Sequence, residues 1–595
     1  FGSSGVQCCA GLCASVPCLH VASDSLQKLV FGMVDFDEAS GKAPEWYEAI
    51  NKAVGLDKVD EALRLALAAV KKVRADGDSA GEIAALRASA KANIFKGDVW
   101  NAKRNIDDSL KLARQAGDKK AEAAAQHMLA KAHLAEKKLS AANRVAQEAV
   151  DAYRSLGDEM GIAAALNTLA KVRLAQAEMK QAYEFVNEAV KGFKAVGDDL
   201  GREGQAYAYQ TLLQVRLLQE KYQDALLVAE DMEDMYAQLD SNNGRGIAHL
   251  AAAEVSLQMG DLQTALDKAT SASEFFQAGG NKKKTGTALF VMANAFITTE
   301  QWQEASKLAD GAYRVFHDAK DKRGKADVLN IVSISLIATK QYASASAVMT
   351  EMAFLYRQLK DKQMEAISLQ KLAKNQIKMI DTPGQMPQDG WKQDDIEAPV
   401  RNAKRAVALY GELNALQSTA HAEALLALSA TLAFTGLYTE ALGRAVQAQK
   451  VYQALGACEA DALLGIAKVH MAQGQSELAQ KFLADAIDVA TETGTTEQVA
   501  AARDLLEKAS QKKGKTGDMN ASSLARTAFT LMYGDIVKAQ FKAFESRAIT
   551  LPGGVGKSSS KDGKLPMFAP PERHQVVYET RKQLVPTDPK TGMPL

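Results

Sequence analysis

Apolar and polar residues alternate along most of this chain at spacings of three and four residues. The stretches "AALNTLAKVRLA" (164–175) and "AYEFVNEAVKGF" (182–193) both show this spacing, which places the apolar side chains on one face of an α-helix. Similar stretches follow one another from about Ala43 to Val499. The pattern therefore predicts an all-α chain of consecutive amphipathic helices.

One alanine marks the same place in each pair of these helices. It recurs every 40 residues at Ala62, Ala102, Ala142 and Ala182, and after three extra residues at Ala225, Ala265, Ala305 and Ala345. In most pairs small residues also stand seven positions after it and twelve positions before it, such as Ala69 and Ala90. Small side chains let helices approach closely, and stacked pairs bury a face that one pair cannot bury alone. We therefore predict an α-solenoid of about eleven helix pairs.

A Gly-Asp dipeptide joins successive pairs in the first part of the chain. It stands at Gly77–Asp78, Gly117–Asp118, Gly157–Asp158 and Gly197–Asp198. Glycine readily adopts the left-handed conformation that ends a helix, and aspartate caps the free amides of the next helix. These dipeptides predict where one pair ends and the next begins.

The small residues at fixed places and the two-helix unit resemble tetratricopeptide repeats. The 40-residue length with a Gly-Asp joint is similar to the long-repeat branch, which includes kinesin light chains and the adaptors with Leu-Gly-Asn repeats. The resemblance implies a right-handed superhelix whose concave groove binds segments of partner proteins. Two features depart from those subfamilies: the aromatic residue common inside the second helix is small here, as at Ala146, and no Leu-Gly-Asn triplet occurs.

The same pattern divides the chain into three parts. We expect a flexible leader at residues 1–42, the solenoid at 43–510 and a flexible basic tail at 511–595. Prolines interrupt the ninth pair, so residues 380–399 are expected to form an inserted loop.

One amphipathic helix is expected within the tail, at about residues 522–548. We expect it to dock on the last repeats or to hold a partner helix, because an exposed apolar face marks an interaction site. That face consists of Phe529, Met532, Ile536, Phe541 and Phe544.

Composition narrows the classes of partner and cofactor. The 595 residues include 72 Lys+Arg and 72 Asp+Glu, so net charge gives no sign of a nucleic-acid partner, and none is expected. No apolar stretch of about 18 residues occurs, so we expect no membrane span and a cytoplasmic protein of undetermined oligomeric state. Four of the 5 cysteines lie in the leader without the paired spacing of a zinc site. They are either unstructured thiols or lipidation sites, and no metal or cofactor is expected.

No catalytic motif is complete in this sequence. Gly556-Lys557-Ser558 resembles the end of a phosphate-binding loop, but Leu551 stands where that motif needs glycine, and no helix-forming segment follows. The eight histidines form no HExxH pair. Catalysis is therefore not expected.

The position just after the third small residue of each pair is expected to face the groove. It is Lys91, Lys131 and Lys171 in three successive pairs, and His127 and Asn167 lie one turn earlier on the same face. A row of lysines predicts a site for an extended or helical peptide with acidic side chains. The alternative is an ordinary solvated helix face.

Two functions fit these features. The first is a non-catalytic scaffold or adaptor that binds other proteins in its groove. The second is the regulatory or targeting module of a larger enzyme whose catalytic part precedes Phe1.

Overall fold

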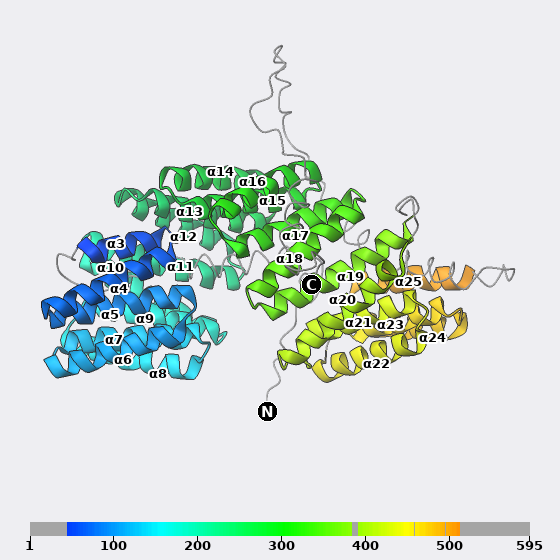
Figure 1. The fold of residues 1–595 in the computed structure, drawn as a ribbon, viewed down its shortest axis with the longest axis horizontal. Coiled ribbons are helices and arrows are strands. Elements are labelled where there is room, and N and C mark those ends of the chain that lie inside the picture. Colours follow the sequence, from blue (N-terminus) through cyan, green and yellow to red (C-terminus); the bar gives the residue numbers. More distant parts are fainter. Residues whose placement is uncertain (1–44, 57, 383–390, 457–458, 494, 512–595) are drawn as a thin grey trace, which may run out of the picture. The chain divides into compact units, whose positions relative to one another are not determined.

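A computed structural model describes residues 45–56, 58–382, 391–456, 459–493 and 495–511. In these ranges every regular element is an α-helix, and the helices divide into two compact units after Thr339 (Figure 1). The leader and the tail predicted from the sequence, including the face from Phe529 to Phe544, lie outside the described residues.

Unit 1 holds helices α3 to α17. The odd-numbered helices are the first helices of their pairs: α3 (Glu45–Gly55), α5 (Ser79–Lys96), α7 (Lys119–Ala135), α9 (Glu159–Ala175), α11 (Asp199–Leu218), α13 (Asn242–Met259), α15 (Lys282–Thr298) and α17 (Lys322–Ala338). The even-numbered helices are the second helices: α4 (Val59–Asp76), α6 (Val99–Ala116), α8 (Leu139–Leu156), α10 (Met179–Val196), α12 (Tyr222–Gln238), α14 (Leu262–Ala278) and α16 (Trp302–Asp318).

Unit 2 continues the same alternation. Its helices are α18 (Tyr342–Gln358), α19 (Lys362–Asp381), α20 (Gln393–Glu412), α21 (Thr419–Phe434), α22 (Tyr438–Leu455), α23 (Glu459–Ala472), α24 (Ser476–Glu492) and α25 (Thr496–Gln511). In chain order the described helices from α3 to α24 alternate as the first and second members of the eleven predicted pairs, and α25 follows alone. The chain is thus an all-α, tetratricopeptide-like solenoid.

The repeated small residues lie at the centre of the helix contacts. Ala62, Ala102, Ala142 and Ala182 are all fully buried, as are Ala90 and Ala130 in the first helices. Most first helices after α3 bury side chains around much of their circumference; α9 buries each residue from Ala163 to Ala170. Second helices bury one face only. The prediction that small residues allow close packing is confirmed.

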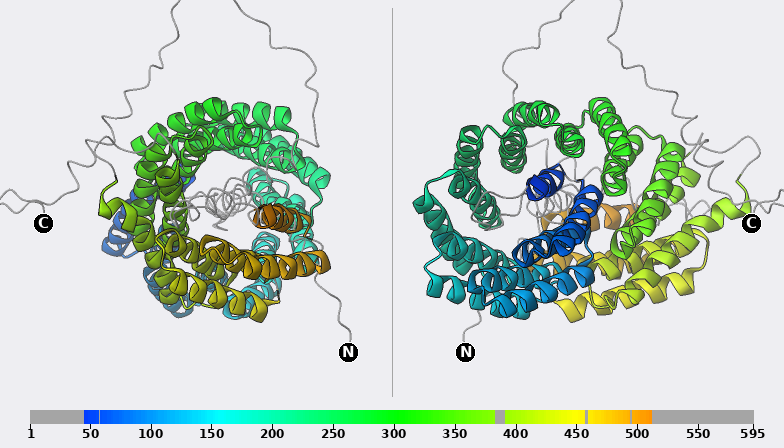
Figure 2. Two further views of the ribbon diagram at one scale, coloured as in Figure 1. Left: turned by 90° about the vertical axis from the view of Figure 1, so that its right-hand side faces the viewer. Right: turned by 60° about the vertical axis from the view of Figure 1, so that its left-hand side comes forward.

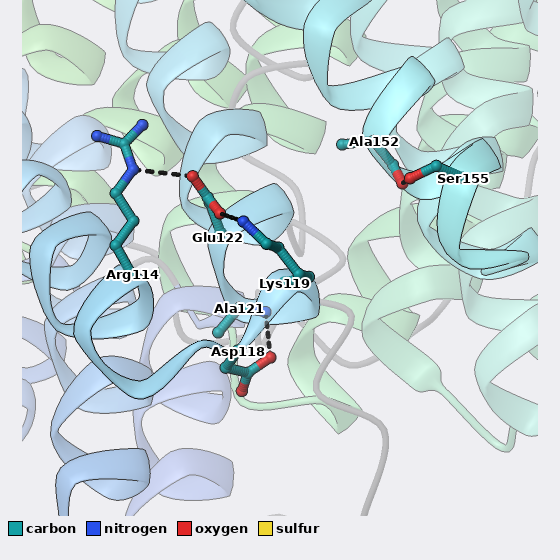
Figure 3. Close-up of polar contacts among 7 residues, drawn as sticks. All are labelled: Arg114, Asp118, Lys119, Ala121, Glu122, Ala152 and Ser155. Atoms are coloured by element: carbon teal, nitrogen blue, oxygen red, sulfur yellow. Dashed lines mark hydrogen bonds and ion pairs between the residues drawn. The ribbon is translucent and has the colours of Figure 1, made fainter.

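Figure 3 shows the joint between α6 and α7, which contains the predicted Gly-Asp dipeptide at Gly117–Asp118. Gly117 ends α6 with a left-handed φ of 68°, and the Asp118 carboxylate accepts a 2.9 Å hydrogen bond from the Ala121 amide. Arg114 reaches across the joint to Glu122 over 2.8 Å. Because that ion pair is exposed, it contributes at most about 1 kcal/mol, and the cap does more to define the joint.

A second contact at the joints was not predicted from the sequence. An aromatic residue near the end of a second helix lies against a glycine in the next first helix, eight residues later. The ring is so close that a Cβ atom on the glycine would overlap it. This holds for Tyr153 with Gly161, Tyr236 with Gly244 and Phe316 with Gly324.

The inserted loop of unit 2 is shorter than the predicted segment 380–399. α19 continues to Asp381 and α20 begins at Gln393, so both ends of that segment are helical. The Lys392 backbone amide bonds a first-turn carboxylate of α20 over 3.2 Å and sets its start. Pro399 lies inside α20. It stands in the second turn, where its fixed φ suits a helix but its missing N–H removes one backbone hydrogen bond.

We predict that Ala182→Leu lowers the free energy of unfolding by roughly 1–3 kcal/mol. Ala182 packs with Leu174 and Val215 in a buried cluster, so a larger side chain must push helices apart. Urea denaturation measures the change, with Ala195→Leu on the exposed face of the same helix as the control. Equal stability of the two variants would contradict this packing.

Candidate functional site

The first helices form the inner layer of unit 1. They pack on their second helices and also on one another: α5 on α7, α7 on α9, and α9 on α11. Because the second helices bury only one face, they form the outer layer; Figure 2 allows the helices of unit 1 to be followed from blue to green. We call the face of α5 to α15 that points away from the second helices the inner surface.

The three predicted lysines occupy one position in α5, α7 and α9, but their surroundings differ. Lys91 is only 1 % exposed, and its Nζ donates to Asn51 Oδ1 over 3.2 Å. Lys171 is half-buried and donates to the Tyr207 hydroxyl over 2.6 Å, with its Nζ 3.9 Å from the centre of that ring. Lys131 is half-buried. The row therefore consists of partly enclosed ammonium groups rather than fully solvated ones.

His127 and Asn167 occupy the position one turn earlier, and both are buried. His127 Nε2 lies 2.7 Å from Thr168 Oγ1, and its ring meets the edge of Tyr153. Asn167 is 0 % exposed, and neither its amide oxygen nor its amide nitrogen has a hydrogen-bond partner in the described structure. His127 is thus part of a polar contact between repeats, whereas Asn167 retains an unused donor and acceptor.

Two carboxyl groups follow the lysine row on the inner layer. Glu203 in α11 is exposed, yet the protein around it raises the pKa of its carboxyl group, and the Lys91 ammonium acts in the opposite direction. Glu254 in α13 is 2 % exposed, and neither carboxyl oxygen has a hydrogen-bond partner. Burial raises the pKa of Glu254 to about 8, against the effect of Lys284. Glu254 is therefore mostly protonated at neutral pH.

Unit 2 has a further lysine at the same repeat position, which the sequence reasoning missed. Lys374 in α19 follows Ala373, and Ala373 stands 40 residues after the small residue Ser333. The 40-residue repeat period is the pattern in the sequence that could have identified Lys374. The inserted loop concealed that signal because the marker alanine of the next pair no longer falls on the 40-residue spacing.

Lys374 lies among groups of opposite charge. Burial lowers its pKa, while the carboxylates of Glu423 and Asp461 raise it. Gln498 Nε2 lies 3.4 Å from each Asp461 carboxylate oxygen. Nearby protein carboxylates reduce the attraction that this lysine offers to an acidic ligand.

Other kinds of site have little support in the described ranges. No group of three or more His, Cys, Asp or Glu side chains there is placed to hold a metal ion. Among the same residues, no helix is both long enough and apolar enough to span a membrane.

Comparison with known proteins gives a resemblance of fold. No protein-family model and no curated protein matches the sequence. A STAND signal-transduction ATPase with a tetratricopeptide repeat sensor, from Pyrococcus horikoshii, is similar over 63 % of this chain and 54 % of its own, with 16 % identity and a TM-score of 0.42. Apo RapI is similar over 66 % of this chain and 99 % of its own, with 11 % identity and a TM-score of 0.41. The apo quorum sensor NprR from B. thuringiensis is similar over 60 % and 97 %, with 13 % identity and a TM-score of 0.39.

The present chain thus spans about half the length of the ATPase. At TM-scores below 0.5 these similarities say nothing about ligands, and any function has to be argued from the residues of the inner surface.

Proposed function

We propose that this chain is a non-catalytic scaffold or adaptor that binds acidic segments of other proteins on the inner surface of unit 1. The observation that carries the proposal is the repetition of lysine at one position of three adjacent first helices, in Lys91, Lys131 and Lys171. The 40-residue period with its Gly-Asp joint supports placing the array in the long-repeat branch of tetratricopeptide proteins.

The spacing of the row suits an extended segment. Adjacent packed helices lie about 8–10 Å apart, so ammonium groups at one repeat position recur at roughly that distance. In an extended chain, side chains two or three residues apart are separated by about 7–10 Å. A segment with acidic residues at such intervals can therefore meet successive lysines.

Two lysines of the row donate hydrogen bonds that a carboxylate would accept more strongly. Lys91 donates to the Asn51 amide and Lys171 to the Tyr207 hydroxyl, and both acceptors are neutral. A hydrogen bond between an ammonium and a carboxylate is stronger than one to a neutral oxygen. His127 and Asn167 belong to the proposed site as the residues one helical turn away.

The test is a change of charge along the row. We expect the variant Lys91→Gln/Lys131→Glu/Lys171→Glu to bind a fluorescein-labelled hexaglutamate peptide roughly tenfold more weakly than the wild-type chain, or worse. Three contacts of about 0.2–1 kcal/mol each produce this effect. Glutamine replaces Lys91 because a carboxylate at this buried position would be unpaired. Fluorescence anisotropy measures the affinity, and added salt should weaken wild-type binding.

A matched control exists on the outer layer. Lys71, Lys111 and Lys191 share one repeat position on α4, α6 and α10 and are exposed. The variant Lys71→Gln/Lys111→Glu/Lys191→Glu changes the net charge equally but should retain the affinity. If both triple variants bind the peptide equally well, the row does not bind acidic segments.

A further inference from the structure

A hydrogen bond joins the first described helix of unit 1, α3, to the start of α15. Asn281 Nδ2, just before α15, donates to the Gly55 carbonyl oxygen at the end of α3 over 3.2 Å. The two residues are 226 positions apart in the sequence, and Asn281 is only 2 % exposed. The first helix pair therefore contacts a helix six pairs further along the chain.

The residue type at position 281 fits this contact. Other first helices with a described side-chain cap begin at an aspartate or a serine: Asp78, Asp118, Asp158, Asp198, Ser241, Asp321, Asp361 and Ser418. Asn281 Oδ1 makes the usual cap by accepting from the Lys284 amide over 3.1 Å. Its amide nitrogen remains free to donate to Gly55. Aspartate at the cap lacks a donor, and serine carries its donor on the same short hydroxyl that makes the cap.

Helix α3 also contacts the lysine row. Asn51 lies one turn before Gly55 on α3 and accepts the hydrogen bond from Lys91. Lys91 is also near enough to Glu203 in α11 to lower the pKa of that carboxyl group. The same short helix thus bonds the first lysine of the row and the start of α15.

We propose that α3 is a latch on the inner surface: the Gly55–Asn281 hydrogen bond favours the closed position of α3 beside Lys91, and opening of α3 exposes Lys91 to an acidic peptide segment. The role in ligand access rests on the proposed function, whereas the latch itself does not. α3 also buries Tyr47, Ile50, Ala53 and Val54 against α4 and α5, so the closed form predominates. Loss of one neutral hydrogen bond raises the open population by about fivefold. A ligand that binds only the open form loses affinity in proportion to the closed population.

The variant Asn281→Asp tests the latch in the full chain. Aspartate retains the cap on α15 but removes the donor to Gly55. We expect amide hydrogen exchange of residues 45–55 to rise about fivefold. Acetylation of Lys91 by an N-hydroxysuccinimide ester, followed by mass spectrometry, should accelerate by a similar factor. The exposed Lys71 should react at an unchanged rate and serves as the internal reference.

Asp118→Asn is the matched control, because it exchanges the same two residue types at the cap of α7, where Gly55 is not the partner. Wild-type rates of exchange and labelling in Asn281→Asp, or equal increases in the control, would overturn the latch. The hexaglutamate peptide should bind Asn281→Asp about fivefold more tightly than wild type. Faster labelling with unchanged peptide affinity would refute control of access. If neither protein binds the peptide while exchange and labelling rise, the latch stands and the acidic ligand of the proposed function is wrong.

Discussion

Glu254→Gln is expected to raise the free energy of unfolding by about 3–5 kcal/mol above about pH 8.5 and to change it little near pH 4.5. The buried Glu254 carboxyl group has a pKa of about 8 in the folded chain, against an ordinary value of 4.5. Between these pH values the folded chain holds a proton that the unfolded chain has released. Wild-type stability therefore falls as pH rises through this window, by at most about 1.4 kcal/mol per pH unit. Glutamine carries no proton to lose, so the variant avoids this decrease.

Urea denaturation of both proteins at several pH values measures the difference, because all other titrating groups are shared. Glu274→Gln on α14 makes the same chemical change at an exposed site and should show no comparable pH-dependent gain. A difference between Glu254→Gln and wild type that does not vary with pH would show that the Glu254 carboxyl group is not isolated from solvent.

Phe316→Ala is expected to lower the free energy of unfolding by about 3–5 kcal/mol. The Phe316 ring is buried and lies between two glycines of neighbouring first helices. A Cβ atom on Gly286 would come within 3.0 Å of the ring, and one on Gly324 would overlap it. Removal of the ring leaves a cavity that the rigid helix backbones on either side fill only in part.

The close fit between the Phe316 ring and Gly324 predicts that the effect of Gly324→Ala on stability changes sign when the ring is removed. In the wild-type background Gly324→Ala should cost roughly 1–3 kcal/mol because the new methyl group displaces the ring. In the Phe316→Ala background the same change should stabilise the chain by up to about 1 kcal/mol, since alanine favours a helix over glycine. Gly311→Ala on α16 is the control: its Cβ would meet only Leu289 at 3.8 Å, so it should stabilise both backgrounds. The urea midpoints of the single and double variants measure the coupling energy between Phe316 and Gly324. If Gly324→Ala stabilised the wild-type chain, the close contact between the ring and this glycine would be contradicted.

Much of the fold could be predicted from the sequence because the same types of residue recur at the same places in successive repeats. The spacing of apolar residues indicated the helices, and buried alanines such as Ala142 and Ala182 indicated where they meet. The Gly-Asp dipeptides located four joints. The Gly-Asp pattern did not locate the later joints, because Lys320 and Lys360 adopt the left-handed conformation there in place of glycine, at φ of 55° and 57°. Aspartate caps still follow them.

The candidate site was predictable only in part. Repeat position put Lys91, Lys131 and Lys171 at equivalent places in three successive first helices, but it did not reveal that Asn51 and Tyr207 accept hydrogen bonds from two of them. It also did not distinguish these lysines from Lys374, whose neighbours carry opposite charge.

The sequence by itself determined the helices, their pairing and the repeat position of each lysine, because these depend on residues within one repeat or the next. The tertiary structure alone decided which polar groups are enclosed and what they meet. The 2 % exposure of Glu254 depends on how neighbouring helices enclose it. The bond between Gly55 and Asn281 across 226 residues depends on the curvature summed over many pairs. Small rotations between neighbouring repeats accumulate along a solenoid, and no local pattern of residues specifies their sum.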